Sequence, residues 1–179
     1  DTEQGNQSIA IGTLAGGTAQ LGYAVAIGRE AAQETQGYQA IAMGYRAAEN
    51  DQGTQGVAIG VTAGQNIQSD YGISIGTESG QSAQGENAVA VGRRSGRYNS
   101  GLSAVAMGYY AGYNTQGQTA TAVGSLAGAY NQGNDSVAVG NEAGSNVQGA
   151  NCVAVGVYAG RQDQGAQSVA VGYRAGCAG

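Results

Sequence analysis

The stretch "QGAQSVAVGYRAG", residues 164–176, decides the fold, because the whole chain repeats its pattern. Every sixteenth residue counted back from Gly172 is a glycine, down to Gly12. After Asp1 to Glu3, eleven 16-residue units starting at Gln4 fill the remaining sequence without insertion or deletion. A fixed period of this kind is typical of proteins in which one supersecondary unit stacks on the next. We therefore expect residues 1–179 to form a single repeat array, and we expect this array to be part of a longer fibre protein.

The repeat positions are numbered here from Gln4 (position 1) to Ala19 (position 16). Positions 5–9 read small-Val-Ala-Val-Gly, as in "SVAVG" at 136–140, and positions 12 and 13 are Ala-Gly or a near equivalent. A β-branched stretch followed by Ala-Gly and then Gln-Gly is typical of strand, turn, short strand and turn. Glycine costs about 1 kcal/mol at each helical site, which disfavours a helical repeat. The predicted fold is all-β, a parallel β-roll or solenoid of eleven 16-residue coils.

Position 1 is glutamine in ten of the eleven units, with Ser100 as the exception. Stacked parallel coils place equivalent positions about 4.8 Å apart, so eleven coils form a rod about 50 Å long. Side-chain amides at this spacing can donate to one neighbour and accept from the other, which predicts a structural ladder. The alternative is that each glutamine is only a polar corner residue. The ladder would consist of Gln4, Gln20, Gln36, Gln52, Gln68, Gln84, Gln116, Gln132, Gln148 and Gln164.

Alternation along the strand puts positions 6 and 8 on one face and positions 5, 7 and 9 on the other. Both faces carry apolar or small residues, which is typical of a strand buried on both sides. Two large apolar side chains per coil are too few to cover both faces, so something else must cover one of them, and the simplest cover is an identical roll in a closed homo-oligomer. Positions 3, 4, 10, 11 and 14 to 16 are then expected to face solvent. The strand residues expected in the core or the subunit interface include Val89, Val91, Val105, Met107, Val137, Val139, Val153, Val155, Val169 and Val171.

Composition narrows the function further. The net charge of −5, with only seven basic residues, gives no basic face for nucleic acid or an anionic membrane. The chain has no histidine, and no nucleophile stands beside a base, so we expect no enzyme and no cofactor. The aspartates share no repeat position, which argues against a calcium-binding roll. The threonines are scattered, so they form no rank of the kind that binds ice.

The segments "ENAVAVG" (86–92), "NDSVAVG" (134–140) and "ANCVAVG" (150–156) resemble the repeats of trimeric autotransporter adhesin heads, of the type found in collagen-binding adhesins. The resemblance implies a left-handed parallel β-roll that forms a homotrimer at a bacterial cell surface. One departure is the length of the unit, since these heads commonly use a shorter repeat. The same roll also occurs in fibres of phages and large viruses.

The expected function is therefore that of a non-catalytic, extracellular module of a cell-surface or virion-surface fibre. It would mediate or project attachment to host or other surfaces. Its partners would be other copies of itself and a host surface protein or glycan, with no contact to nucleic acid or membrane. Two alternatives stay open: a phage or large-virus fibre module, and a monomeric solenoid that binds ice or carbohydrate.

Tyrosine and arginine are favoured on recognition surfaces. One group of them occupies two successive units and is our candidate contact patch, although the same side chains could instead shield coil edges or contact a neighbouring subunit. Cys152 replaces a small residue at position 5 and is expected to be buried, whereas Cys177 lies at variable position 14. The candidate contact patch consists of Arg93, Arg94, Arg97, Tyr109, Tyr110 and Tyr113.

Overall fold

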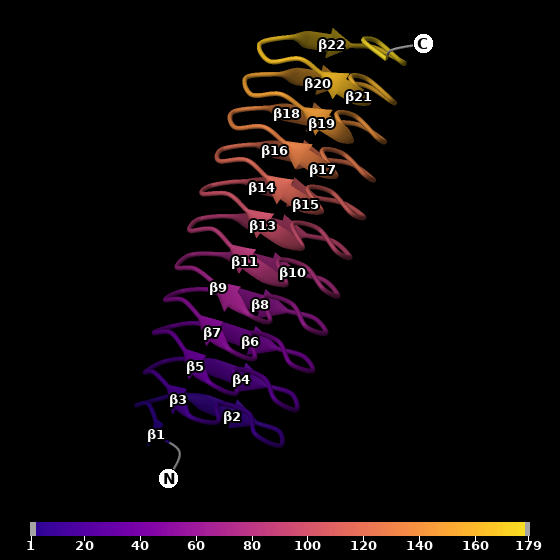
Figure 1. The fold of residues 1–179 in the computed structure, drawn as a ribbon. Helices are drawn as coiled ribbons and strands as arrows, with labels where there is room; N and C mark the ends of the chain where they lie inside the picture. Colours follow the sequence, from indigo (N-terminus) through magenta and orange to yellow (C-terminus); the bar gives the residue numbers. More distant parts are fainter. Residues whose placement is uncertain (1–2, 178–179) are drawn as a thin grey trace.

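The computed structural model describes residues 3–177, which form a stack of coils with the two ends of the chain at opposite ends of the stack (Figure 1). Each coil contributes one strand to each of two parallel sheets. Each strand residue pairs with its equivalent one repeat later, as Val105 does with Thr121. The 16-residue period of the sequence therefore sets the register of both sheets. The described residues include no helix that could cross a membrane.

The first sheet is built from short strands that end at position 1 of the repeat. Its strands are β1 (Glu3–Gln4), β3 (Ala19–Gln20), β5 (Thr35–Gln36), β7 (Asp51–Gln52), β9 (Ile67–Gln68), β11 (Ser82–Gln84), β13 (Tyr98–Ser100), β15 (Asn114–Gln116), β17 (Tyr130–Gln132), β19 (Asn146–Gln148) and β21 (Gln162–Gln164).

The second sheet is built from positions 6 to 8. Its strands are β2 (Ile9–Ile11), β4 (Val25–Ile27), β6 (Ile41–Met43), β8 (Val57–Ile59), β10 (Ile73–Ile75), β12 (Val89–Val91), β14 (Val105–Met107), β16 (Thr121–Val123), β18 (Val137–Val139), β20 (Val153–Val155) and β22 (Val169–Val171).

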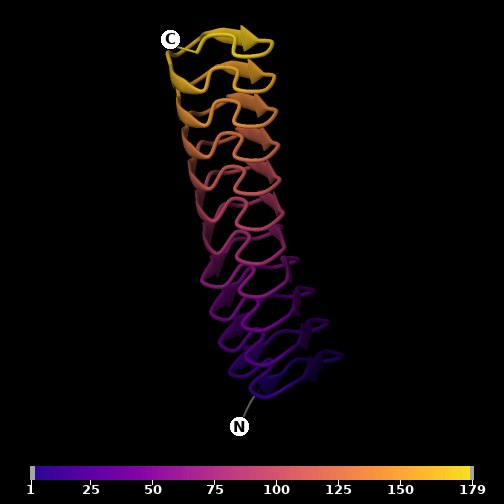
Figure 2. The same ribbon diagram turned by 90° about the vertical axis from the view of Figure 1, so that its right-hand side faces the viewer.

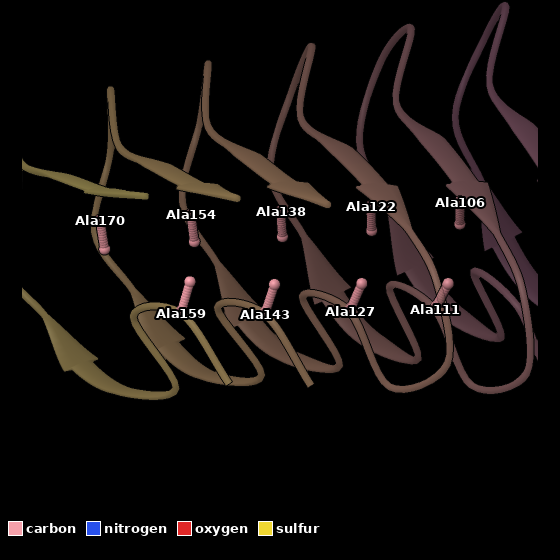
Figure 3. Packing of buried hydrophobic residues seen from close by; sticks show 9 residues of the cluster. All are labelled: Ala106, Ala111, Ala122, Ala127, Ala138, Ala143, Ala154, Ala159 and Ala170. Atoms are coloured by element: carbon pink, nitrogen blue, oxygen red, sulfur yellow. The ribbon is translucent and has the colours of Figure 1, made fainter. Parts of the chain in front are cut away.

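The interior of the roll is lined by alanine. Position 7 of the second sheet and position 12 of the following turn point toward one another across the coil, as Ala122 and Ala127 do (Figure 3). Both of these side chains are fully buried. An interior filled by methyl groups leaves no room for a larger apolar side chain.

Positions 6 and 8 consequently point outward. At position 8, Met107 is 44% exposed and Ile75 is 38% exposed. Ala106, at position 7 of β14, is buried. The strand residues expected in the core or the subunit interface, namely Met107 and the nine valines from Val89 to Val171, are thus excluded from the roll's interior. They form an apolar strip on the outer face of the second sheet, because the pleat alternates and the interior positions 7 and 12 hold only small side chains, alanine or, at Ser74, Ser79 and Ser95, serine.

Glycine at position 9 is required by close backbone contact. At Gly108, φ is +133°, and a Cβ atom would lie 2.5 Å from the carbonyl oxygen of Gly124 in the next coil. Position 13 is more tolerant, because Ala32 and Ala48 occupy it with φ of 48° and 47°. The first kind of glycine avoids a clash with the backbone of the next coil, whereas the second eases a left-handed turn and a Cβ there would meet a side chain first, at Gly112 the Oε1 of Gln116 at 2.6 Å.

The coils change conformation near the middle of the chain. From Ala83 onward, position 16 has a positive φ, 54° at Ala83 and 53° at Asn99, and the strands of the first sheet lengthen from two residues to three. Figure 2 shows the N-terminal coils stacked at a different inclination from the coils above them.

Replacing glycine by alanine should destabilise the fold more at position 9 than at position 13. We expect Gly108→Ala to lower the free energy of unfolding by about 3 kcal/mol, since both the φ angle and the neighbouring backbone oppose a Cβ atom. Gly112→Ala, at position 13 of the same coil, should cost about 1 kcal/mol. Urea denaturation of both variants provides the measurement, and equal losses would contradict the assignment of position 9 as a backbone contact.

Candidate functional site

From Gln20 to Gln164, the position-1 glutamines lie inside the coil, whereas Gln4 in the first coil is exposed and its Nε2 donates to the carbonyl oxygen of Ser8. Gln36 is fully buried, and its Nε2 donates hydrogen bonds to the carbonyl oxygens of Val25 at 2.8 Å and Ala40 at 3.2 Å. Gln116 in the second half of the chain donates to the equivalent carbonyls of Val105 and Ala120. These amides therefore satisfy backbone acceptors at the junction between the turn and the second sheet, a role that the sequence pattern alone did not reveal.

Direct bonds between glutamine side chains occur over part of this column. They run without interruption from Gln20 to Gln84 and reappear from Gln148 to Gln164. Ser100 replaces the glutamine above Gln84, and its hydroxyl bonds instead to the carbonyl of Gly96. In the part of the chain that the structure describes, the buried Oε1 atoms of Gln116 and Gln132 have no hydrogen-bond partner. The continuous part ends where position 16 changes its backbone conformation.

The candidate contact patch lies on the turn face, at positions 10 to 14 between the two sheets. The structure adds a carboxylate to it: Glu78 Oε2 lies 2.8 Å from Arg94 Nε and 2.9 Å from Arg97 Nη2. Positions 11 and 14 of one coil lie beside position 11 of the preceding coil, so a glutamate contacts arginines of the next repeat. Glu78 is absent from the patch predicted from the sequence, because its two arginine partners belong to the next repeat and the contact exists only between stacked coils.

The aromatic rings of this patch hold the arginines in place. The guanidinium of Arg94 lies 5.3 Å from the ring centroid of Tyr110 and also donates a hydrogen bond to its hydroxyl. Arg93 lies 5.8 Å from the ring of Tyr109, which contacts Tyr110 edge-on at 4.5 Å. Each such cation–π contact at an exposed site contributes about 0.5 to 1 kcal/mol.

Arg97 extends the patch toward the first sheet. Its guanidinium lies 4.8 Å from the ring centroid of Tyr98 and 5.9 Å from that of Tyr113. The rings of Tyr110 and Tyr113 are 4.7 Å apart. The structure thus brings all six residues of the predicted patch together and adds Tyr98, which the sequence could have signalled by its place directly after Arg97.

The same arrangement recurs along the turn face. Glu30 pairs with Arg29 at 2.8 Å and with Arg46 at 2.6 Å, and Glu142 pairs with Arg161 at 2.9 Å. Glu30 is only 6% exposed, so the expectation that position 11 faces solvent is wrong for this coil. Arg29 and Arg46 pair with this carboxylate. Because Arg46 belongs to the next coil, the pattern of a single repeat does not predict this burial.

Position 14 carries a directed chain of hydrogen bonds over four coils. Gln65 Nε2 donates to Glu49 at 2.6 Å, Gln81 Nε2 donates to Gln65 at 2.8 Å, and Arg97 Nε donates to Gln81 at 2.7 Å. A carboxylate only accepts and a guanidinium only donates, so the two ends fix the direction of the chain. These contacts leave Arg97 engaged within the roll rather than free.

Ion pairing shifts the acidity of two glutamates. The hydrogen bond from Arg94 holds the pKa of Glu78 below its ordinary value of 4.5 despite partial desolvation. The hydrogen bond from Arg46 does the same to the pKa of Glu30. Both carboxylates are therefore ionised at neutral pH and serve as partners of arginine. The arrangement suits contact and rigidity rather than proton transfer.

The two cysteines are both free thiols. Cys152 is buried, where its Sγ lies 2.9 Å from the carbonyl oxygen of Gly165. Cys177 is partly exposed, and its Sγ lies 2.6 Å from the carbonyl oxygen of Tyr158. The structure joins them by no disulfide.

Residues 116–143 match the family model of the YadA head domain repeat, in two copies. This segment contains β16, β17 and β18 together with the Ala127-Gly128 turn between β16 and β17. Comparison with curated proteins and with solved structures gave no match. The family match and the β-solenoid confirm the expected resemblance to an adhesin head.

Restoring the missing glutamine should stabilise the roll. We expect Ser100→Gln to raise the free energy of unfolding by about 1 kcal/mol, because the new amide gains the backbone acceptors Val89 and Ala104. Ser103→Gln, at exposed position 4 where the repeat carries Gln39 elsewhere, is the matched control and should change little. Thermal unfolding followed by circular dichroism is the measurement. An equal effect of both substitutions would refute the role assigned to the buried amide.

The ion pairs of Glu78 predict a pH dependence of stability. Because its pKa is lower in the folded state, ionised Glu78 stabilises the fold above pH 4.5, and this contribution disappears as the pH falls through the lowered pKa. Glu78→Gln should therefore melt below the wild type at pH 7, and the difference should shrink in acid. Glu86→Gln, which removes an exposed carboxylate that makes no ion pair in residues 3–177, is the control. A difference that stayed constant with pH would contradict the ion-pair explanation.

Proposed function

We propose that this chain, whose residues 116–143 match the YadA head domain repeat in two copies, is a non-catalytic module of a cell-surface fibre, assembled from three identical, left-handed rolls. In this arrangement the roll mediates or projects attachment to a host or other surface.

The observation that carries the proposal is the apolar strip on the second sheet. Positions 6 and 8 place valine, isoleucine or methionine outward on every strand of that sheet, with Thr121 as the only polar residue. The strip runs the length of the rod, about 50 Å at the spacing of parallel strands. Soluble monomers rarely leave a continuous apolar surface of this extent in water. Another copy of the same strip is the simplest cover for it.

The extent of this strip supports a closed cyclic assembly. Each roll offers one continuous apolar face, and identical faces can all be buried if they surround a common axis. The resemblance to the heads of trimeric adhesins favours three rolls in this assembly. The turn faces then point away from the axis, which leaves the candidate contact patch around Arg94 and Tyr110 on the outside of the fibre, in the place where a surface protein could reach it.

The architecture also suits a fibre mechanically. Backbone hydrogen bonds join every coil to the next, as between Gly124 and Met107 at 2.8 Å, and these bonds run along the rod. Such a stack resists extension because many parallel bonds must open together. A module of this kind can hold an adhesive surface away from the cell even where it makes no contact itself.

The mass in solution tests the assembly. Light scattering should give about three times the chain mass of 17.7 kDa. Met107→Lys, on the apolar strip, should shift the protein toward monomer, because it places a charge in the proposed interface.

Val147→Lys is the matched control, since Val147 is 42% exposed against 44% for Met107 but lies on β19 of the other sheet. It should leave the mass unchanged. A monomeric wild type, or dissociation by Val147→Lys as readily as by Met107→Lys, would reject this assembly.

A further inference from the structure

The turn face contains a hollow where position 14 changes from large to small side chains. From Gln33 to Tyr113 this position always carries a long or aromatic residue, but the next two coils carry Ala129 and Ser145, and Arg161 follows. The result is an open cavity of about 440 Å³ over Ala129 and Ser145. Two coils correspond to about 10 Å along the rod. This volume lies at the lower end of the range of small-molecule sites.

The walls of this hollow are partly apolar. Tyr130, on β17, lines one side and is 42% exposed, while Leu126 lines another. The ring of Tyr113 contacts Tyr130 edge-on at 5.9 Å and supports its position. An exposed ring held by a second ring is a preformed platform, which loses little conformational freedom when a ligand packs on it.

The rest of the rim is polar and electrically balanced. Glu142 and Arg161 both line the hollow, and their ion pair of 2.9 Å leaves no net charge there. Asn146 and Gln162 add two side-chain amides, which are exposed and form no hydrogen bond with any other residue of 3–177. By contrast, the Asn50 amide at the same repeat position donates to Asn66. Each free amide offers both donors and an acceptor to a ligand.

We propose that this hollow binds one neutral saccharide ring of a surface glycan. A pyranose combines a face of C–H groups, which packs on an aromatic ring, with hydroxyls that both donate and accept hydrogen bonds. The hollow supplies the matching groups: the ring of Tyr130, the amides of Asn146 and Gln162, and the oxygens of Glu142. A charged ligand would have to compete with the Glu142–Arg161 pair.

The assignment rests on the proposed function and deepens it, since it gives the fibre a chemical class of ligand. Tyr130, Asn146 and Gln162 lie on β17, β19 and β21 of the first sheet, whereas the apolar strip belongs to the second. The hollow therefore stays open to solvent in the proposed trimer.

Saturation-transfer NMR on the purified protein tests the assignment, with methyl glycosides of glucose, galactose, mannose and N-acetylglucosamine at millimolar concentration as probes. At least one probe should receive magnetisation from the wild type. Ser145→Gln should abolish this transfer by filling the hollow, because the fold already accommodates a glutamine at the same repeat position, where Gln81 accepts a bond of 2.7 Å from Arg97. Tyr130→Asn, which introduces the residue found at position 15 in Asn114, should weaken binding roughly tenfold.

Ala166→Gln is the matched control, since it adds the same side chain at exposed position 3, where the repeat carries Gln118. It should bind as the wild type does. Transfer to none of the four probes, or transfer that survives both Ser145→Gln and Tyr130→Asn, overturns the saccharide site. A trimer that binds no glycoside rejects the site but keeps the proposed function, whereas a monomer that binds one rejects the assembly and keeps the site.

Discussion

The narrow interior of the coil is the constraint on which the rest of this structure depends. Two alanine methyl groups, such as those of Ala122 and Ala127, fill the space between the second sheet and the turn. A coil this thin cannot bury larger apolar side chains, so valine, isoleucine and methionine lie outside. It also brings backbone carbonyls close to the interior, where water cannot reach them. Most of the buried glutamines, such as Gln36 and Gln116, satisfy two of these carbonyls, which an apolar side chain could not do.

Because the coils stack, side chains that interact lie above one another along the rod. Residues that interact are one repeat apart or nearly so, as with Glu78 and Arg94, or Gln65 and Gln81. A charged side chain in one coil can thus be paired with an oppositely charged side chain in the next coil. A small residue leaves a hollow only if the next coil also has a small residue at the same repeat position. Ala129 and Ser145 meet this condition. Surface function in such a fold depends on runs along the rod rather than on any single repeat.

The division between interior and exterior also links folding to assembly. The interior is polar enough and small enough that it contributes little apolar burial per coil, whereas the outer strip offers two large side chains per coil. The apolar surface that remains exposed on one roll is the surface that an assembly would bury. Stability and oligomerisation would then be coupled, as expected for a chain with so thin a core.

The sequence by itself determined the all-β class, the parallel register of one repeat per coil, the small-residue face of the strand and the grouping of six Arg and Tyr side chains. These follow from local rules, namely the period, the alternation of a strand and the conformational freedom of glycine. Only the tertiary structure decided that alanine faces inward and valine outward, since both faces of the strand looked apolar. It also decided that Glu78 pairs with Arg94 and that Ala129 and Ser145 open a hollow. The physical reason is that these features depend on contacts between coils, and a pattern read within one repeat does not contain the geometry of its neighbours.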